Sequence, residues 1–280
     1  MDKTSDYANQ SSNKKFQLFI RTSLVAPLIG KSQYNKDYEA FIKLLNMNKF
    51  EIYTDSDEFD DILNISNPHE LEIITKKYTN VTDLQTNLLE VQNFLYSDYM
   101  IEKCKKYMIC TFGKTNEHVV LDRYLEVSGV SKVNSSDKYF MTVKIFESEY
   151  FDVILTGTPD CITTDNRIVE IKNRVHTFSK HIKECDMVQL QLYLNMYNLT
   201  RGTLVEGMIY SESDIRINTF EVEKDAELFE QVKECIVRIC ILLYFLLKDE
   251  SLYLIFEKKS NVDKSNFIMK NLKIINDMFI

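Results

Sequence analysis

The sequence predicts an α/β fold in which a central mixed β-sheet is flanked by helices. Segments rich in β-branched residues, which favour strands, alternate with longer segments that have the periodicity of amphipathic helices. The 280-residue chain is 45% hydrophobic and contains only three prolines, so it can bury one large core. Interleaved strands and helices of this kind are typical of a sheet covered by helices.

The N-terminal half is predicted to be helical. Residues 1–15 form a polar tail that we expect to be disordered, and helices are expected from there to about Cys110. A further helix from Phe112 should end at Gly129, because glycine readily adopts the left-handed conformation that closes a helix. No Pro-rich or Ser-rich linker follows, so residues 16–280 are predicted to form a single domain.

Strands dominate the centre of the chain. A strand over Tyr139–Glu147 precedes a predicted β-hairpin, whose strands are Phe151–Leu155 and Ile168–Lys172 and whose turn is polar. The remaining elements are a helix at 186–198, strands at 203–210 and 215–222, and a helix at 226–247. The apolar run Cys235–Leu247 in that last helix is too short to span a bilayer. Residues 251–280 are compatible with an extra helix or with an oligomer contact.

The predicted hairpin carries a pattern of acidic and basic residues. Asp160 precedes its second strand, on which Glu170 and Lys172 share one face because side chains alternate along a strand. The two carboxylates are typical ligands of Mg²⁺, for which Mn²⁺ is a substitute, and the lysine would stabilise the charge that builds up during phosphodiester cleavage. Charged residues on a hairpin are also common where one face is simply solvated, so the pattern alone leaves both interpretations open.

Glu117 is a third candidate acid. In the helix that ends at Gly129, Glu117 shares a face with Val120, Leu121 and Tyr124. A carboxylate on an apolar face is costly unless a metal or another cation compensates its charge. The alternative is a glutamate near the start of a helix, which the helix dipole favours.

A projection of the downstream helix isolates Gln189. Four polar residues form one stripe that we expect to be solvated: Glu184, Gln191, Asn195 and Asn198. Gln189 instead lies among apolar residues and four positions before Tyr193, so the two side chains could act together on a phosphate or a water. A buried glutamine that merely bonds to the backbone is the alternative.

The order of these motifs resembles the PD-(D/E)xK nuclease superfamily, in its RecB-like and lambda-exonuclease-like branch. There is a particular likeness to the YqaJ-type viral recombination exonucleases, over about residues 20 to 210. The matching positions are Glu117, Gly157 with Asp160, Glu170 with Lys172, and Gln189 with Tyr193. The resemblance implies a restriction-endonuclease-like core and a magnesium-dependent DNA exonuclease, in which the three acids and the main-chain carbonyl of Ile171 hold the metal.

The resemblance extends to the N-terminal segment 21–34. It is similar to the serine-containing helix of the family and to the Gly-x-x-x-Tyr turn after it, which makes Arg21 and Ser23 candidate contacts to DNA. Arg21 lies only two residues before Ser23, whereas lambda-type members place a phosphate-binding arginine several residues earlier. Ring-shaped trimers occur among those members, so the resemblance is also compatible with a homo-oligomer.

The distribution of charge agrees with a local contact to nucleic acid. A net charge of −8 argues against a protein that merely coats DNA, because a basic surface supplies most of the affinity of such proteins. Between Arg167 and Lys183, however, five basic residues stand against one acidic residue. Three of these basic residues are candidate contacts to a phosphate backbone: Arg174, Lys180 and Lys183.

The six cysteines point to an intracellular protein. They form neither a C-x2-C pair nor a tight C-terminal run, so no iron–sulfur cluster is expected. The chain opens without a secretion signal, and a reducing compartment such as cytoplasm, or a viral factory for a viral protein, fits these thiols. The richness in Lys, Asn, Ile and Tyr is compatible with the AT-rich genome of a large DNA virus.

Two other functions fit parts of the pattern. A structure-specific endonuclease or resolvase would use the same site but would lack a pocket for a strand end. A catalytically idle nuclease-like module would bind DNA or another protein in a replication or recombination complex. For the exonuclease itself, a single-strand annealing or replication protein is a candidate partner. The complete set of acids with their lysine argues against the idle module, because such a module has no chemical reason to retain them. No contact with a membrane is expected.

Overall fold

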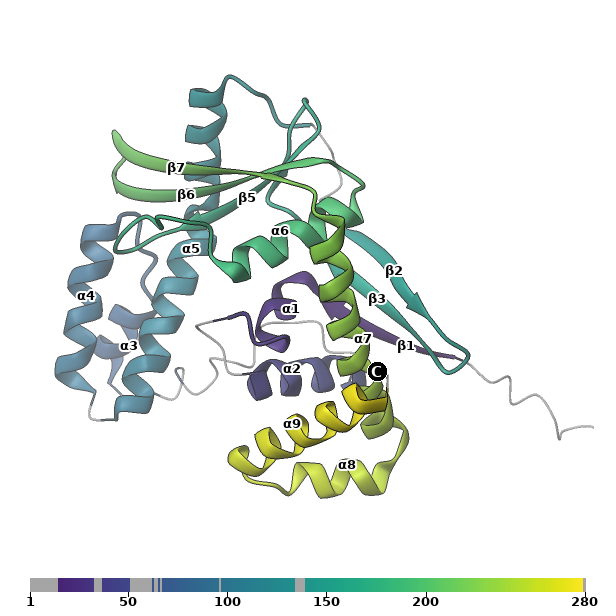
Figure 1. The fold of residues 1–280 in the computed structure, drawn as a ribbon. Coiled ribbons are helices and arrows are strands. Elements are labelled where there is room, and N and C mark those ends of the chain that lie inside the picture. The colour runs from purple at the N-terminus through teal and green to yellow at the C-terminus, as the bar shows by residue number, and fades with distance from the viewer. Residues whose placement is uncertain are drawn as a thin grey trace, which may run out of the picture. The chain divides into compact units, whose positions relative to one another are not determined.

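The computed structural model describes residues 15–32, 37–50, 62, 65, 67–95, 97–133 and 139–278. Apart from Lys15, the predicted disordered tail lies outside these residues. The α/β class is confirmed, but the strands form two sheets and not one central sheet (Figure 1).

Contacts within the chain define two compact units, which are described separately below. The first unit comprises Met1–Glu51, Thr142–Thr156 and Gln231–Ile280, and the second comprises Ile52–Met141 and Gly157–Glu230. The single-domain organisation of residues 16–280 stays a prediction.

The first unit contains a three-stranded sheet in the order β1-β3-β2. Its strands are β1 (Phe16–Arg21), β2 (Met141–Glu147) and β3 (Phe151–Gly157), and β1 pairs in parallel with β3. The sequence had predicted helix and not strand at β1, which is wrong. The five residues of β3 from Phe151 are all buried, as expected of a central strand, and β1 completes the sheet from a distant part of the chain.

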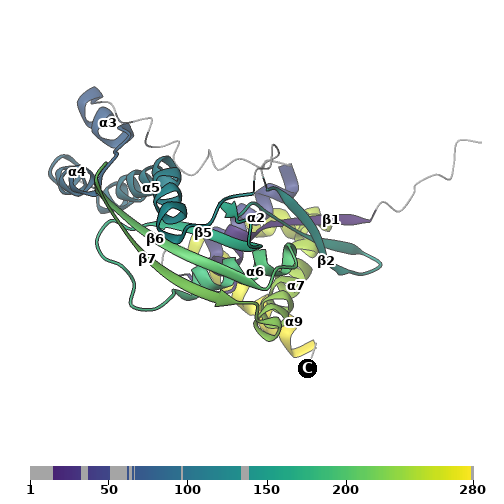
Figure 2. The ribbon, with the colours of Figure 1, turned by 90° about the horizontal axis from the view of Figure 1, so that it is seen from above.

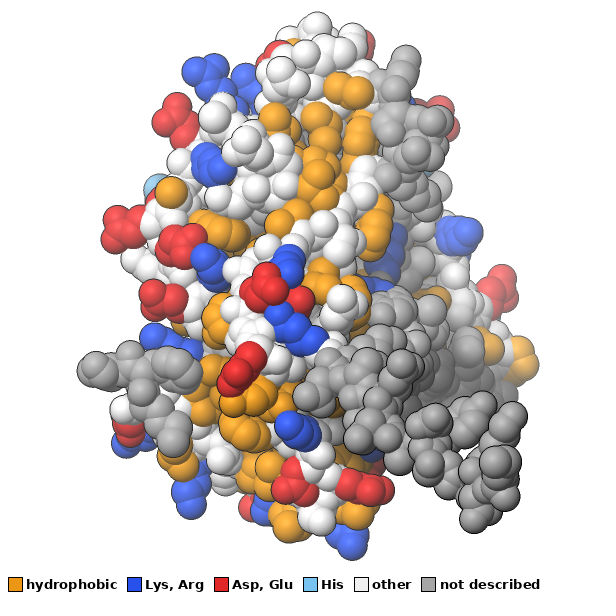
Figure 3. Space-filling model, turned by 90° about the vertical axis from the view of Figure 1, so that its right-hand side faces the viewer, with side chains coloured by type: hydrophobic (Ala, Val, Ile, Leu, Met, Phe, Trp, Pro, Cys, Tyr) orange, Lys and Arg blue, Asp and Glu red, His pale blue; other side chains and the backbone are white. Residues whose placement is uncertain are grey.

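Among the described residues, five helices belong wholly or mainly to the first unit. They are α1 (Thr22–Leu28), α2 (Asp37–Phe50), α7 (Ala226–Lys248), α8 (Glu250–Glu257) and α9 (Asn261–Met278). Tyr244 of α7 packs on the sheet, because its ring stacks on Phe151 with centroids 5.2 Å apart and meets Phe16 edge-on at 5.4 Å. Helices α8 and α9 confirm helix within residues 251–278, and an oligomer contact there stays a prediction. No described helix is long and apolar enough to cross a membrane. On the face in Figure 3, acidic and basic side chains are interspersed with hydrophobic ones.

The second unit contains a four-stranded mixed sheet in the order β4-β5-β6-β7. Its strands are β4 (Cys161–Ile162), β5 (Arg167–Asn173), β6 (Arg201–Ser211) and β7 (Asp214–Glu223). The strand β5 is antiparallel to β4 and parallel to β6, and β6 forms a long antiparallel pair with β7. Figure 2 shows β5, β6 and β7 running side by side.

The predicted hairpin between Phe151–Leu155 and Ile168–Lys172 is therefore wrong. Phe151–Leu155 belongs to β3 in the other sheet, and the partner of β5 in its short hairpin is the two-residue strand β4. The intervening Pro159 has no main-chain N–H to donate to a ladder, which disfavours a strand that continues from β3 into β4.

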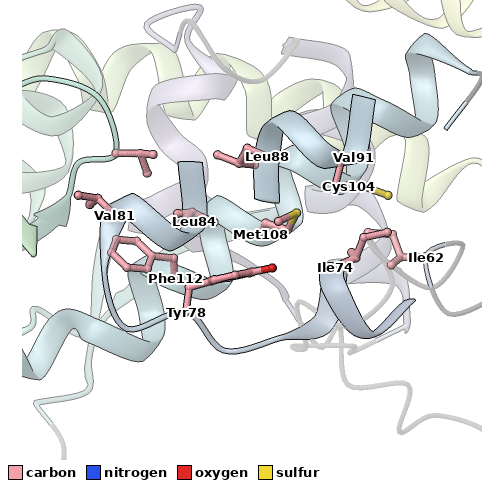
Figure 4. Close-up of a cluster of buried hydrophobic side chains, with 11 residues drawn as sticks. Ile62, Ile74, Tyr78, Val81, Leu84, Leu88, Val91, Cys104, Met108 and Phe112 are labelled. Carbon is pink, nitrogen blue, oxygen red and sulfur yellow. The ribbon is translucent and has the colours of Figure 1, made fainter. Parts of the chain in front are cut away.

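In the described part of the second unit there are four helices: α3 (Pro68–Thr75), α4 (Val81–Phe94), α5 (Asp98–Ser128) and α6 (Glu184–Met196). Helix α5 ends as predicted, with Gly129 in the left-handed conformation at φ 70°. Side chains of α3, α4 and α5 form one hydrophobic cluster, in which Phe112 and Met108 of α5 lie beside Leu84 of α4 (Figure 4). The C-terminal half of α5 packs Val120 and Tyr124 on the sheet.

Candidate active site

The turn before β4 and the end of β5 bring three predicted residues together in the second unit. The carboxylate of Asp160 accepts a hydrogen bond from the main-chain N–H of Ile171, with Oδ2 and N 2.6 Å apart. Glu170 is buried, and its Oε1 accepts a bond of 2.7 Å from Nζ of Lys172. The structure thus joins Asp160, Glu170 and Lys172, although not through the predicted hairpin.

Helix α6 holds Lys172 from the other side. Lys172 Nζ donates to Gln189 Oε1 at 3.1 Å, and Gln189 Nε2 donates to the hydroxyl of Tyr193 at 3.3 Å. The Tyr193 hydroxyl donates in turn to the main-chain oxygen of Thr158 at 3.0 Å. This chain of bonds runs from the lysine back to the turn that carries Asp160. Gln189 and Tyr193 thus lie together, as predicted, and their action on a phosphate or a water stays a prediction.

Gln191 does not lie on a solvated stripe, contrary to the prediction. Its side chain is only 2% exposed, Nε2 donates to the oxygen of Glu223 at 2.7 Å, and Oε1 accepts from the N–H of Asp225 at 2.8 Å. Glu184 and Asn198 are exposed as expected. The physical reason is that β7 leaves the sheet at Glu223, where two main-chain groups need partners that no helical projection reveals.

Burial raises the pKa values of all three acids. Burial and then the negative charge of Asp160 raise the pKa of Glu117 to about 7, against an opposing effect of Lys172. Burial raises the pKa of Glu170 to about 8, although the Lys172 ammonium opposes the shift and Asp160 adds to it. Burial also raises the pKa of Asp160. The three carboxylates disfavour one another's charge, which is the electrostatic situation that a bound cation relieves.

One carboxylate oxygen provides a test of whether a metal fits. Glu170 Oε2 is buried and has no hydrogen-bond partner, whereas Oε1 of the same group is held by Lys172. Among the residues that the structure describes, no three His, Cys, Asp or Glu side chains are placed to surround an ion together. Oxygen ligands are nevertheless what Mg²⁺ prefers, and an unpartnered buried carboxylate oxygen suits a divalent cation.

Two residues that the sequence interpretation missed place Glu117 at the site. Asn173 Nδ2 donates to the main-chain oxygen of Gly113 at 2.9 Å, one turn before Glu117 on α5. Gly207 pairs with Asn173 across β5 and β6, and a Cβ on Gly207 would lie 2.2 Å from Cγ2 of Val120. These two contacts lie on either side of Glu117 along α5 and hold the helix close to β5 and β6. A glycine inside a strand is a known sign of close approach, so Gly207 was detectable, but Asn173 carried no such signal.

The predicted DNA contacts differ in their surroundings. Arg174 is not on a free basic surface as predicted, because its guanidinium is paired with Asp186 and Glu206 and its side chain is 14% exposed. Lys180 is exposed and Lys183 immediately precedes α6. Arg21 and Ser23 belong to the first unit, so their contact with DNA stays a prediction.

Comparisons with known proteins give structural neighbours only. No protein-family model and no curated protein matches the chain. The chain is similar to LHK-Exo, an alkaline exonuclease from Laribacter hongkongensis, in a complex with dAMP: identity is 13%, coverage is 82% of this chain and 89% of that chain, and the TM-score is 0.48. It is also similar to a phage-related exonuclease from Haemophilus somnus 129PT, at 12% identity, coverage of 82% and 96%, and a TM-score of 0.45. Because these TM-scores are low, any argument about function has to rest on the side chains of the site.

Proposed function

We propose that this chain is a metal-dependent DNA exonuclease whose site is built on Asp160, Glu170 and Lys172. The observation that carries the proposal is that the two carboxylate oxygens of Glu170 have different surroundings. One of its oxygens holds the Lys172 ammonium, while the other is buried without a partner. A cation beside a lysine suits phosphodiester cleavage, because both neutralise charge that develops on the phosphate and the leaving oxygen.

The residues that would hold Mg²⁺, or Mn²⁺ in its place, are Asp160, Glu170 and Glu117, with the main-chain carbonyl of Ile171 as a further candidate. When bound, the ion would supply positive charge to the phosphate and increase the acidity of a water molecule. Asp160 is already oriented for this role, because its Oδ2 is fixed on the N–H of Ile171. Its other oxygen remains for the ion.

Lys172 acts as a fixed positive charge. Burial by itself lowers the pKa of Lys172, but the carboxylates of Glu170 and Asp186 more than offset that effect and raise the pKa above its ordinary value. The ammonium therefore stays protonated and stabilises negative charge in the transition state. Gln189 orients it through the 3.1 Å bond to Oε1.

The exonuclease assignment, as opposed to an endonuclease, rests on the resemblance of the ordered motifs. Linear and closed circular duplex DNA, incubated with the protein and Mg²⁺, separate the two activities. We expect degradation of the linear DNA alone. Cleavage of both forms would identify an endonuclease, and cleavage of neither would refute nuclease activity.

Alanine substitutions test the site itself. Asp160→Ala and Glu170→Ala should each abolish degradation without unfolding the protein, as judged by circular dichroism. Asp214→Ala is a matched control, because Asp214 is a partly exposed aspartate at the start of β7 that pairs with Arg216. Normal turnover in either site variant would show that the site is assigned to the wrong residues.

A further inference from the structure

A second network of charged side chains lies beside the site, with Glu206 at its centre. Glu206 is fully buried on β6 and is the register partner of Lys172 on β5. Arg174 Nε donates to Glu206 Oε1 at 2.6 Å, and Arg174 Nη2 donates to Asp186 Oδ2 at 2.7 Å. Arg174 therefore links β6 to the first turn of α6.

Glu206 also anchors the connection between β5 and α6. The main-chain N–H of Ser179 donates to Glu206 Oε2 at 2.8 Å, and the Ser179 hydroxyl donates to Oε1 at 2.7 Å. Asn218 of β7 adds a longer contact of 3.4 Å to Oε2. Burial alone would raise the pKa of Glu206, but the bonds from Ser179 and Arg174 hold it below its ordinary value, so the carboxylate stays charged. A buried charge is tolerated only with such partners, and each donor that it holds becomes fixed in place.

The anchored connection, residues 175–183, contains cations and no acidic residue. Three of its basic side chains are exposed: His176, Lys180 and His181. Lys183 closes it at the start of α6. The connection begins three residues after Lys172 and leads into the helix that carries Gln189, so it belongs to the same part of the second unit as the site.

We propose that residues 175–183 form a loop that binds the phosphate backbone of a DNA strand, and that Glu206 positions this loop. The inference rests on the proposed function, because it assigns the contact that brings the substrate to the site. Lys180 and Lys183 would neutralise phosphates, and the bonds from Glu206 to Ser179 would keep the loop in its binding conformation before DNA arrives. Such preorganisation lowers the ordering cost of binding.

Binding measured apart from cleavage tests the loop. A fluorescently labelled short DNA duplex is titrated with protein in Ca²⁺, and anisotropy gives the Kd at several salt concentrations. Lys180→Ala should raise the Kd several-fold and reduce the slope of log Kd against log salt by about one, as expected for one lost phosphate contact. Glu206→Gln should raise the Kd about tenfold and reduce the slope by about one to two, since both lysines lose their placement.

A matched control and a double variant distinguish positioning from general damage. Glu221→Gln removes an ion pair with Arg167 elsewhere on the sheet and should leave the Kd and the slope unchanged. Lys180→Ala should add almost nothing in the Glu206→Gln background, because the loop is already misplaced there. A folded Glu206→Gln variant with the wild-type Kd and salt slope would overturn the inference.

Two further outcomes keep the test decisive. If Glu206→Gln does not fold, Ser179→Ala replaces it, since this change removes only the hydroxyl bond of the loop. A smaller rise in Kd, about threefold, is then expected, and an unchanged Kd would overturn the inference. A wild-type protein that binds the duplex but never cleaves it, and that loses binding in these variants, would support the loop while refuting the proposed nuclease activity.

Discussion

Replacing Gly207 by alanine should disturb the site from a distance. The new Cβ would lie 2.2 and 2.5 Å from the two γ-carbons of Val120 and 2.9 Å from its Cβ. A change of rotamer moves the γ-carbons but not Cβ, so α5 itself must move away from β6, by roughly 1 Å, to restore ordinary contact. Overpacking of this kind typically costs about 1–3 kcal/mol of stability.

The displacement matters because Glu117 lies one turn from Val120 on the same helix. A misplacement of about 1 Å at a reacting centre can cost about 10²-fold in rate. Gly207→Ala should therefore lower kcat on linear DNA by about this factor, while the Tm falls by several degrees. Both are measured on the purified variant, by a DNA degradation assay with Mg²⁺ and by thermal unfolding.

Gly202→Ala on the same strand is the matched control. There the three atoms nearest to a Cβ would be Cδ1, Cγ and Cδ2 of Leu190, at 3.0 to 3.3 Å, so a shift of this side chain by a few tenths of an ångström suffices. Val120→Ala combined with Gly207→Ala should recover part of the lost activity, because it removes the two closest contacts. If Gly207→Ala is as harmless as Gly202→Ala, α5 does not set the position of Glu117 as we describe.

Three further predictions concern the site and its surroundings. Lys172→Arg should reduce kcat by about 10² or more, because a planar guanidinium does not replace a point charge between Glu170 and Gln189; full activity would contradict the assigned role. Gln191→Leu should lower stability by about 1–3 kcal/mol in denaturant unfolding, because it leaves two main-chain groups at the end of β7 without hydrogen-bond partners. Gln189→Leu should instead impair cleavage and spare stability, and the opposite pair of results would exchange the two roles. Without metal, the Tm should fall as the pH rises, because burial lifts the pKa of Glu170 from 4.5 to about 8 and that of Glu117 to about 7. The folded state then binds protons that the unfolded state has lost, and this stability disappears between about pH 4.5 and 8. Mg²⁺ should restore the Tm mainly at the upper end, and a flat profile would argue against buried acids.

The alternation of side chains along β5 was enough to predict the site pair. Glu170 and Lys172 face the same way because of local backbone geometry, which depends on no other part of the chain. The partner of β5 was not predictable in this way. Its neighbours are β4 and β6, and β6 begins beyond an intervening helix. Strand pairing is a property of distant segments, so two correct strands were joined into a hairpin that does not exist.

Helical periodicity had a similar limit on α6. It correctly separated Gln189 from the apolar residues around it, because that comparison uses only the helix itself. It placed Gln191 in solvent, because the helix by itself gives no sign of a buried partner for a polar side chain on a polar stripe. The burial of Gln191 comes from the end of β7, whose main-chain groups it satisfies at 2.7 and 2.8 Å.

Arg174 shows that the number of basic residues in a segment does not reveal which of them lie on a binding surface. The sequence counts it among the basic residues around the site, but its guanidinium is engaged by Asp186 and Glu206, which lie 12 and 32 residues further along the chain. An arginine that bridges two carboxylates has little positive charge left to attract a phosphate. Arg174 instead stabilises the local structure, because it connects β6 to α6, while Ser179 connects the loop to the same carboxylate of Glu206. The basic residues of this segment therefore differ in their surroundings: Arg174 is engaged inside the protein, whereas Lys180 is exposed.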